Sequence, residues 1–236
     1  MKKGQLFLIP CPLGEVPPMS VLPLSVVKII ESTDHFVVEH EKNARRFIKA
    51  ICPQKKQADL KLSTINKFTD PLEIPELIQP CLDGLDLGII SDAGCPGVAD
   101  PGAEVVDFAH KHGIKVVPLV GPSSILLSLM ASGLNGQKFA FHGYLPIDKI
   151  ERKQYIKQLE KQSEQEAQTQ IFIETPYRNN QLLAALVASL KPDTQLCVAV
   201  NLTLEDEFIL TKQVRQWQPS DYDFHKKPSI FMFLAQ

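Results

Sequence analysis

The sequence lacks an excess of charge of either sign, a long hydrophobic run and any paired-cysteine motif. Its 236 residues include 25 Lys and Arg and 27 Asp and Glu, which gives a net charge of -2. This balance excludes a protein that is attracted as a whole to nucleic acid or to an anionic membrane. No stretch reaches the roughly 18 consecutive apolar residues that a membrane-spanning helix requires. Any contact with nucleic acid must therefore come from a local patch.

Cysteine is also scarce, since the chain has five widely spaced cysteines and no C-x-x-C pair. This pattern excludes a disulfide framework and a zinc site, and it indicates a reducing cytoplasm. The basic start before Leu6–Ile9 is not typical of a signal peptide, because the apolar stretch is short and Pro10 and Pro12 follow it at once. We expect a cytoplasmic protein with no membrane segment and no bound metal.

Short apolar runs, each followed by a glycine- or proline-rich turn and a helical stretch, recur through the first half of the chain. The expected strands are 6–9, 36–38, 87–90 and 115–119, and the expected helices are 21–30, 43–51, 76–82 and 103–112. Strands that alternate with helices predict a mostly parallel sheet with helices on both faces.

The second half has a different pattern, with helices expected at 124–132, 150–166 and 179–190 and strands at 139–142, 170–174, 196–200, 207–210 and 229–234. Several late strands without intervening helices predict a mixed sheet. We place the boundary near Val120, with an N-terminal α/β domain at 1–120 and a C-terminal α/β domain at 121–236. The residues expected in its core are Leu126, Leu127, Leu129, Met130, Val214 and Trp217.

The segment from Ser91 to Gly102 is rich in glycine and proline and leaves the carboxyl end of an expected buried strand. Ligands of open α/β sheets bind at that edge. Its glycines permit positive φ angles and a close approach of the backbone to a ligand. Asp100 is expected to cap the following helix, with Pro101 at its first position.

The charge of this segment narrows the choice of ligand. No Lys or Arg occurs between Asp83 and Lys111, while Asp92 and Asp100 lie inside the loop. Phosphate-binding loops are neutral or carry a lysine, so two carboxylates oppose a nucleoside triphosphate. They suit a ligand with a positive charge and a ribose, such as S-adenosylmethionine. Two alternatives to such a ligand site are a plain turn and a Mg²⁺ site formed by the two aspartates.

Two further loops are candidates for the same crevice. The segment Pro10–Gly14 follows the first strand, where it either lines the crevice or forms a rigid turn. Gly121-Pro122-Ser123-Ser124 places hydroxyl groups and free N–H groups at the start of a helix. These groups can meet a carboxylate or carbonyl of a ligand, or Ser123 can be the N-cap.

A basic run starts at Lys42 and includes Arg45, Arg46 and Lys49, which share one face of the expected helix. This face is either a contact for nucleic acid or an ordinary solvated surface.

Five motifs in register carry a resemblance to a known family: Pro10-Cys11-Pro12-Leu13-Gly14, Ser91 to Gly102, Gly121-Pro122-Ser123-Ser124, Gly143-Tyr144-Leu145-Pro146 and Glu174-Thr175-Pro176-Tyr177-Arg178. The chain resembles the tetrapyrrole-methylase-like S-adenosylmethionine-dependent methyltransferases. Within them it is most similar to the branch that methylates ribose 2′-hydroxyl groups of small-subunit ribosomal RNA.

The resemblance implies two α/β domains with the cofactor S-adenosylmethionine in the cleft between them, and a homodimer. It places at the cofactor Pro10, Asp92, Ala93, Gly94, Val98, Ser123, Ser124, Tyr144 and Thr175. A ribose hydroxyl is a poor nucleophile that benefits from a general base. The candidates are Glu39 and Glu174, each at the end of an expected strand; a solvated carboxylate and a salt bridge to Arg178 are the respective alternatives.

The candidates for binding the RNA substrate are Arg45, Arg46, Lys49, Tyr177 and Arg178, of which Arg178 can hold a phosphate and Tyr177 can stack on a base. For Tyr177 the alternative is packing in the core.

Two motifs depart from the family pattern. An acidic-Asp-Thr-Arg stretch is replaced by Glu39-His40-Glu41-Lys42, and an Arg-Glu-Leu-Thr-Lys stretch by Val200-Asn201-Leu202-Thr203-Leu204. Two alternatives to an RNA methyltransferase therefore remain open. One is a methyltransferase that acts on a tetrapyrrole or other small acceptor, and the other is a non-catalytic module that binds S-adenosylmethionine or RNA.

Overall fold

The computed structural model describes residues 2–235. The chain divides into two compact units between Ser123 and Ser124, a few residues after Val120. Each unit has its own sheet and its own hydrophobic core.

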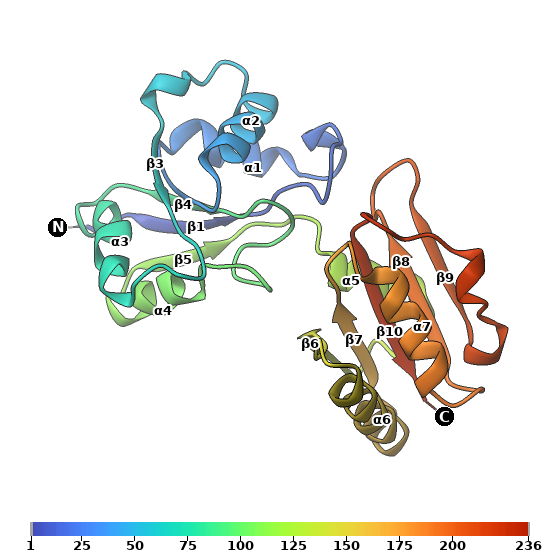
Figure 1. The fold of residues 1–236 in the computed structure, drawn as a ribbon. Helices are drawn as coiled ribbons and strands as arrows, with labels where there is room; N and C mark the ends of the chain where they lie inside the picture. The colour runs from blue at the N-terminus through green and yellow to red at the C-terminus, as the bar shows by residue number, and fades with distance from the viewer. Residues whose placement is uncertain (1, 236) are drawn as a thin grey trace. The chain divides into compact units, whose positions relative to one another are not determined.

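The first unit contains one five-stranded sheet (Figure 1). Its strands are β1 (Gln5–Ile9), β2 (His35–Val38), β3 (Lys61–Thr64), β4 (Leu87–Ile90) and β5 (Lys115–Pro118). Its helices are α1 (Leu24–Ser32), α2 (Glu41–Ile51), α3 (Ile74–Leu82) and α4 (Ala103–Lys111). The strand order is β3-β2-β4-β1-β5, and every pair of neighbours is parallel. The predicted parallel sheet is confirmed.

Alternating strand residues build a separate core on each face of this sheet. Phe36 and Val38 pack with residues of α1 and α2 on one face, whereas Val37 between them packs with residues of α3 and α4 on the other. Figure 1 shows the two helix pairs on opposite sides of the sheet. The period-two alternation of a strand explains why both faces are apolar.

The strand order creates a point of divergence between β1 and β4. The two strands are neighbours, but the chain continues from β1 to α1 on one face and from β4 to α4 on the other. Beyond the carboxyl edge the two connections lead to opposite faces of the sheet, and this edge is the position where open α/β sheets bind ligands.

Two details of the first unit differ from the sequence-based expectations. Strand β3 was not predicted, because Lys61, Ser63 and Thr64 give it little apolar character at the edge of the sheet. The prediction that Asp100 caps α4 was wrong, since the N-cap is Gly102, with a φ of 127° and no side-chain cap.

The second unit contains a mixed sheet, as predicted. Its strands are β6 (Phe139–Tyr144), β7 (Thr169–Ile173), β8 (Gln195–Val200), β9 (Phe208–Gln213) and β10 (Ser229–Leu234). Its helices are α5 (Ser124–Ser132), α6 (Lys149–Glu166) and α7 (Asn179–Ser189). The order is β6-β7-β10-β8-β9; β6 and β7 are parallel and the other pairs are antiparallel.

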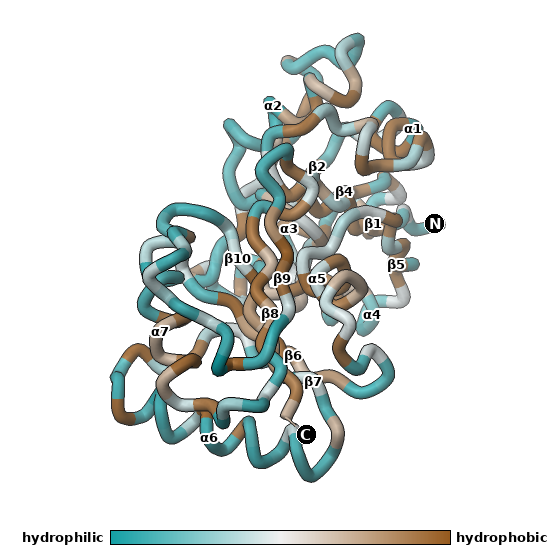
Figure 2. The backbone as a smooth tube through the Cα atoms, turned by 90° about the vertical axis from the view of Figure 1, so that its right-hand side faces the viewer, coloured by the Kyte–Doolittle hydropathy of each residue, from teal (hydrophilic) through white to brown (hydrophobic). Residues whose placement is uncertain are grey.

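The core of the second unit lies between the sheet and the helices α6 and α7, and it includes the buried Trp217 and Val214. Figure 2 shows hydrophobic residues along β8 and a mostly hydrophilic α6. Most residues of α6 that face away from this core are exposed. Leu129 of α5 is buried as predicted, but the prediction was wrong for Leu126 and Met130, which are exposed. Helix α5 is apolar on nearly all sides, so its sequence does not reveal which side faces the sheet.

Among residues 2–235, no helix is both long enough and apolar enough to cross a membrane.

Candidate functional site

Three loops of the first unit meet at the carboxyl edge of its sheet. Cys11, after β1, and Gly94, after β4, exchange two backbone hydrogen bonds, with N···O distances of 2.9 and 3.1 Å. The thiol of Cys95 lies 3.5 Å from the carbonyl oxygen of Pro122, after β5. The three glycine-proline motifs of this half, far apart in the sequence, therefore form one surface.

Glycine is required at two positions of this surface. A Cβ atom on Gly121 would lie 2.2 Å from Cγ of Pro10, so only glycine lets these two loops pack. Gly94 has a φ of 73°, a conformation that L side chains rarely adopt. Its added Cβ would also lie 3.3 Å from Leu13. These two glycines thus let neighbouring side chains, the Pro10 ring and Leu13, pack directly against the backbone of the loops.

A cluster of polar side chains joins the ends of β2 and β4. Glu39, which follows β2, accepts a hydrogen bond from the backbone N–H of Asp92 at 3.1 Å. The carboxylate of Asp92 lies 2.7 Å from Nδ1 of His40 and accepts a hydrogen bond from Asn43 at 3.0 Å. Asp92 therefore holds the start of α2 against the loop after β4.

Three carboxyl groups give this edge a negative potential. Partial burial, followed by the charges of Glu39 and Asp92, raises the pKa of Asp100 to about 6. Burial also raises the pKa of Glu39, and the charge of Asp92 adds to the effect. Carboxylates that disfavour one another's ionisation bind a cationic ligand well, because its charge relieves their repulsion.

This arrangement fits S-adenosylmethionine, which carries a sulfonium and an ammonium group. The residues that would hold it in this unit are Asp92 and Asp100, by their charge. Gly94 is buried and its N–H and carbonyl are both bonded to Cys11, so it fixes the loop that carries Asp92. No group of three or more His, Cys, Asp or Glu residues suited to a metal ion occurs among residues 2–235.

A cavity of about 370 Å³ adjoins the polar cluster. Its wall includes the loop Pro12–Pro18, Asp92 and three residues on one side of α2: Asn43, Arg46 and Phe47. The mixture of apolar wall and a few polar groups is typical of a site for a small organic group.

The other residues predicted at the cofactor in this unit lie in the three loops. Pro10 is buried beneath Gly121. Ala93 and Val98 are exposed on the loop after β4, and Ser123 immediately precedes α5. Contact of these residues with the cofactor stays a prediction.

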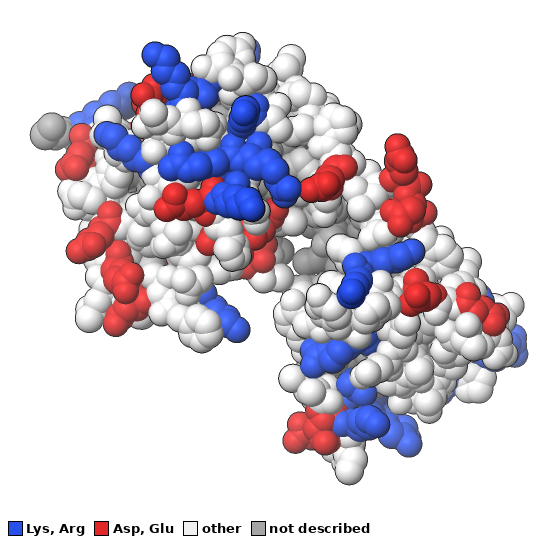
Figure 3. Space-filling view, turned by 45° about the horizontal axis from the view of Figure 1, so that its top comes forward, with Lys and Arg blue, Asp and Glu red and all other residues white. Residues whose placement is uncertain are grey.

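The predicted basic residues of α2 are engaged in local contacts to different extents. Arg45 donates to the carbonyl of Gln57 at 2.8 Å and lies 3.6 Å from Glu41. Arg46 donates to Glu15 at 3.0 Å across the mouth of the cavity, and Lys49 is exposed. Figure 3 shows Lys and Arg side chains gathered on one face of this unit.

In the second unit, the segment after β7 carries the other candidate base. The Glu174 side chain is only 1% exposed, and Oε1 accepts hydrogen bonds from Arg178 Nε at 3.0 Å and Nη2 at 2.5 Å. It also accepts a bond from the N–H of Thr175 at 2.6 Å. These bonds fix Glu174 as the buried half of a salt bridge, which was the alternative considered for it.

The remaining predicted residues of this unit lie at strand ends or at the start of a helix. Tyr144 ends β6 and is exposed, Thr175 follows β7, and Ser124 begins α5. Tyr177 is 67% exposed, which excludes the alternative that it packs in the core.

Sequence reasoning missed His40 and Asn43, the partners of Asp92. His40 lies in the stretch that departs from the family pattern and Asn43 directly follows that stretch; both come after β2, the neighbour of β4. The strand order, which places these two segments side by side, was the information needed to find them.

Comparison with solved structures defines the class of fold. The chain is similar to the methyltransferase CobJ, with a TM-score of 0.64 and 14% identity over 98% of this chain and 94% of that one. It is also similar to uroporphyrin-III-C-methyltransferase from Thermus thermophilus, with a TM-score of 0.58 and 17% identity over 100% of this chain and 93% of that one. The fold is that of this class of methyltransferases.

Sequence comparison gives the family. The model of the Tetrapyrrole (Corrin/Porphyrin) Methylases matches residues 16–217, so the chain belongs to this family, whose members are S-adenosylmethionine-dependent methyltransferases. The chain is 29% identical to ribosomal RNA small subunit methyltransferase I of Vibrio cholerae over 86% of its length, and 30% identical to that of Bacillus subtilis over 87%. These alignments span 67% and 66% of the two relatives.

Proposed function

We propose that this chain is an S-adenosylmethionine-dependent methyltransferase that methylates a ribose 2′-hydroxyl group of small-subunit ribosomal RNA. The observation that carries the proposal is the joined edge of β1, β2 and β4, where Glu39, Asp92 and Asp100 lie around the contact between Cys11 and Gly94. The relatives named as ribosomal RNA methyltransferases support the choice of acceptor.

The roles of the residues follow from their chemistry. S-adenosylmethionine, when bound, supplies an electrophilic methyl group on a positively charged sulfur. Asp92 and Asp100 stabilise positive charge at the edge, and the glycines let the backbone approach the ligand. Glu39 accepts the proton of the attacking hydroxyl group, a task that its raised pKa suits.

Glu39 is the better candidate for the base. It has one hydrogen bond to a backbone N–H, from Asp92, whereas Oε1 of Glu174 accepts from both Arg178 and Thr175. The Glu174 side chain is also only 1% exposed and bound to Arg178, so its carboxylate is already occupied by a structural contact. We therefore assign Glu174 the role of holding the segment after β7 in place.

The binding of RNA is assigned to the exposed Lys49 and to Arg45 and Arg46 of α2, beside the cavity. Phosphate contacts from such residues position a nucleic acid and make its affinity depend on salt. A small tetrapyrrole acceptor would not depend on them in this way.

We also propose that the chain acts as a homodimer in the cytoplasm. Leu126 and Met130, one turn apart on α5, are 51% and 79% exposed, and a second subunit would bury this apolar face. Light scattering of the purified protein tests the dimer through its mass.

The function is tested by transfer of a labelled methyl group from S-adenosylmethionine to small ribosomal subunits that lack the modification. We expect label in the RNA, at a ribose, and a strong loss of rate when Arg45 and Arg46 are both changed to Glu. Label in a porphyrin-like acceptor instead, with no dependence on the two arginines, would replace the RNA by a small acceptor. No transfer to either substrate, despite binding of S-adenosylmethionine, would favour a binding module.

A further inference from the structure

Three exposed side chains gather at one end of the sheet in the second unit: Tyr177, after β7, and His225 and Lys226, before β10. The rings of Tyr177 and His225 lie 5.7 Å apart at an angle of 72°, and Nζ of Lys226 lies 6.0 Å from the centre of the Tyr177 ring. Tyr177 and His225 are 48 residues apart in sequence, counted from their numbers. We call these three side chains the aromatic platform.

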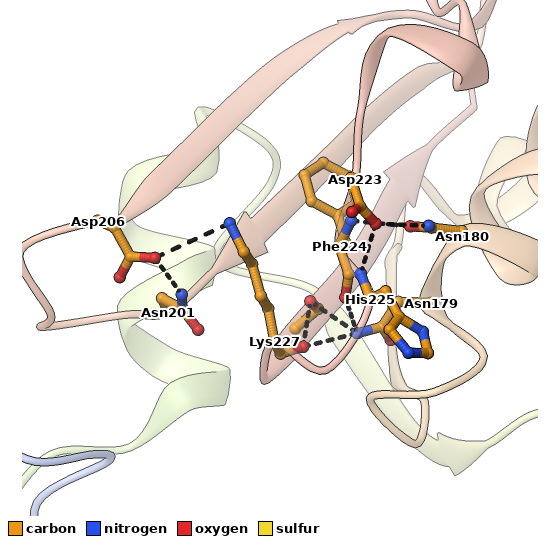
Figure 4. Close-up of polar contacts among 9 residues, drawn as sticks. Asn179, Asn180, Asn201, Asp206, Asp223, Phe224, His225 and Lys227 are labelled. Carbon is orange, nitrogen blue, oxygen red and sulfur yellow. Dashed lines mark hydrogen bonds and ion pairs between the residues drawn. The ribbon is translucent and has the colours of Figure 1, made fainter.

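Two adjacent asparagines at the start of α7 hold the segment that carries His225 and Lys226 (Figure 4). The fully buried Asn179 donates from Nδ2 to the carbonyls of Phe224 and Lys227, at 3.2 and 2.6 Å. Its oxygen, Oδ1, is buried and has no hydrogen-bond partner among the described residues. The structural role of the Asn179 side chain therefore lies in the hydrogen bonds that its nitrogen donates to this segment.

Asn180 holds the same segment from the other side. It donates to Asp223 at 2.8 Å and accepts from the N–H of Phe224 at 2.8 Å. Asp223 in turn accepts from the N–H of His225 at 3.0 Å. The backbone on both sides of His225 is therefore fixed by side chains of α7.

Lys226 adopts a conformation that is uncommon for its type of residue. Its φ is 61°, in the left-handed region, and its N–H donates to the carbonyl of Pro176 at 2.9 Å. The contact joins it to the segment of Tyr177. A strained residue that the surrounding contacts enforce is most often found at functional sites.

The charges near the platform leave Lys226 available for an anion. Arg178 is bonded to Glu174, and Lys227 lies 3.9 Å from Asp206. Lys226 forms no ion pair with any residue in the range 2–235 that the structure describes. An exposed aromatic ring beside one free cation matches an unpaired nucleotide, whose base stacks and whose phosphate is anionic.

We propose that Tyr177, His225 and Lys226 bind an unpaired nucleotide of the RNA substrate, with its base stacked on Tyr177 and its phosphate at Lys226. Asn179 and Asn180 are positioning residues for this site. The proposal rests on the proposed function, since it identifies a second place where the RNA contacts the protein, away from α2 in the sequence.

Binding of a fluorescent single-stranded RNA of about ten nucleotides tests the proposal. We expect Tyr177→Ala to weaken the affinity about tenfold, since stacking of one base accounts for a loss of this order, and Tyr177→Phe to stay within about twofold of wild type. Lys226→Gly keeps the left-handed backbone and removes the charge, so the slope of log K against log salt should fall by about one. Lys157→Ala, on the exposed side of α6, is the matched control.

Binding of S-adenosylmethionine should be the same in all of these variants, which shows that they fold. In methyl transfer to small subunits, Tyr177→Ala should raise KM and leave kcat nearly unchanged. An affinity of Tyr177→Ala equal to that of wild type, or a Tyr177→Phe variant as weak as Tyr177→Ala, would overturn the platform. A wild-type protein that does not bind the RNA would overturn it as well. Binding that depends on Tyr177, with no methyl transfer to ribosomal RNA, would instead overturn the proposed function alone.

Discussion

The two units of this protein hold their functional segments in different ways. In the first unit, close contacts between loops do so: the backbone hydrogen bonds of Cys11 with Gly94 and the packing of the Pro10 ring against Gly121. In the second unit, side chains do so: the salt bridge of Glu174 with Arg178 and the amides of Asn179 and Asn180. The first arrangement requires glycine, because a Cβ atom at Gly121 would overlap the Pro10 ring. The second requires polar side chains that can form hydrogen bonds to a neighbouring segment.

The largest expected effect is on catalysis in the first unit. Glu39→Gln keeps an oxygen that can accept the N–H of Asp92 but removes the base, so kcat for methyl transfer should fall about 10²- to 10⁴-fold. Binding of S-adenosylmethionine should persist. In wild type, the rate should rise with pH through the pKa of Glu39, which burial raises, because the base acts when deprotonated.

The matched control is Glu41→Gln, a change of the same kind two residues later on the exposed start of α2. It should leave kcat unchanged. Equal rates for wild type and Glu39→Gln would show that the reaction has no need of this carboxylate.

A large effect on stability is expected in the second unit. Arg178→Ala leaves the buried carboxylate of Glu174 without its partner, at a cost of about 3 kcal/mol in the free energy of unfolding. Urea unfolding measures the loss. Adding Glu174→Gln should recover part of it, since the two residues are coupled. If Arg178→Ala were neutral for stability and weakened RNA binding instead, Arg178 would be a phosphate contact rather than a support.

A smaller loss of stability is expected for Gly121→Ala in the first unit. The new methyl group would overlap the Pro10 ring, and overpacking of this kind costs about 1–3 kcal/mol. The variant should also bind S-adenosylmethionine more weakly, because the loops after β1 and β5 must separate. Gly136→Ala is the control, as no atom lies within 4 Å of its added Cβ, and thermal unfolding should barely change. A Gly121→Ala protein as stable as this control contradicts the account of the joined loops.

These contrasts explain what the sequence could and could not predict. The parallel sheet followed from apolar runs such as Leu87–Ile90, and the joined loops followed from glycine and proline at strand ends. The edge strand β3 was not predicted, because it has too little apolar character. The exposure of Met130 was not predicted, because its helix is apolar on most sides.

The hydrogen bonds of Asn179 and Asn180 in the second unit could not be predicted for a different reason. Asn179 and Phe224 are 45 residues apart, and no local pattern marks an asparagine that bonds to distant backbone. The same holds for His40 and Asn43, whose partner Asp92 lies in the loop after β4. Contacts between side chains and distant segments require the strand order, which one sequence does not determine.

The smallest expected effect is electrostatic. The pKa of Asp100 is raised to about 6 from 3.8, so the folded protein binds its proton more tightly than the unfolded chain, and stability falls as pH rises from about 4 to 6. A pKa shift of this size corresponds to a loss of about 3 kcal/mol in the free energy of unfolding. Asp100 is half-exposed, so solvent screening reduces the expected loss to about 1 kcal/mol.

Asp100→Asn should therefore raise the Tm at pH 7 by about 2–4 °C, and it should remove this part of the pH dependence. It should also weaken the binding of the cationic S-adenosylmethionine. A Tm that stays the same or falls would mean that burial and the neighbouring carboxylates do not disfavour the ionised form of Asp100.

The most direct test of the central claim is thermal unfolding with and without S-adenosylmethionine, for wild type and Asp92→Ala. At about 100-fold excess over Kd, binding should stabilise wild type by about 2.7 kcal/mol, a shift of several degrees in Tm. The shift should be lost in Asp92→Ala, because the variant lacks a carboxylate of the negative edge and the contacts of that carboxylate with His40 and Asn43. Equal shifts in the two proteins would contradict the placement of the cofactor at the joined edge of β1 and β4.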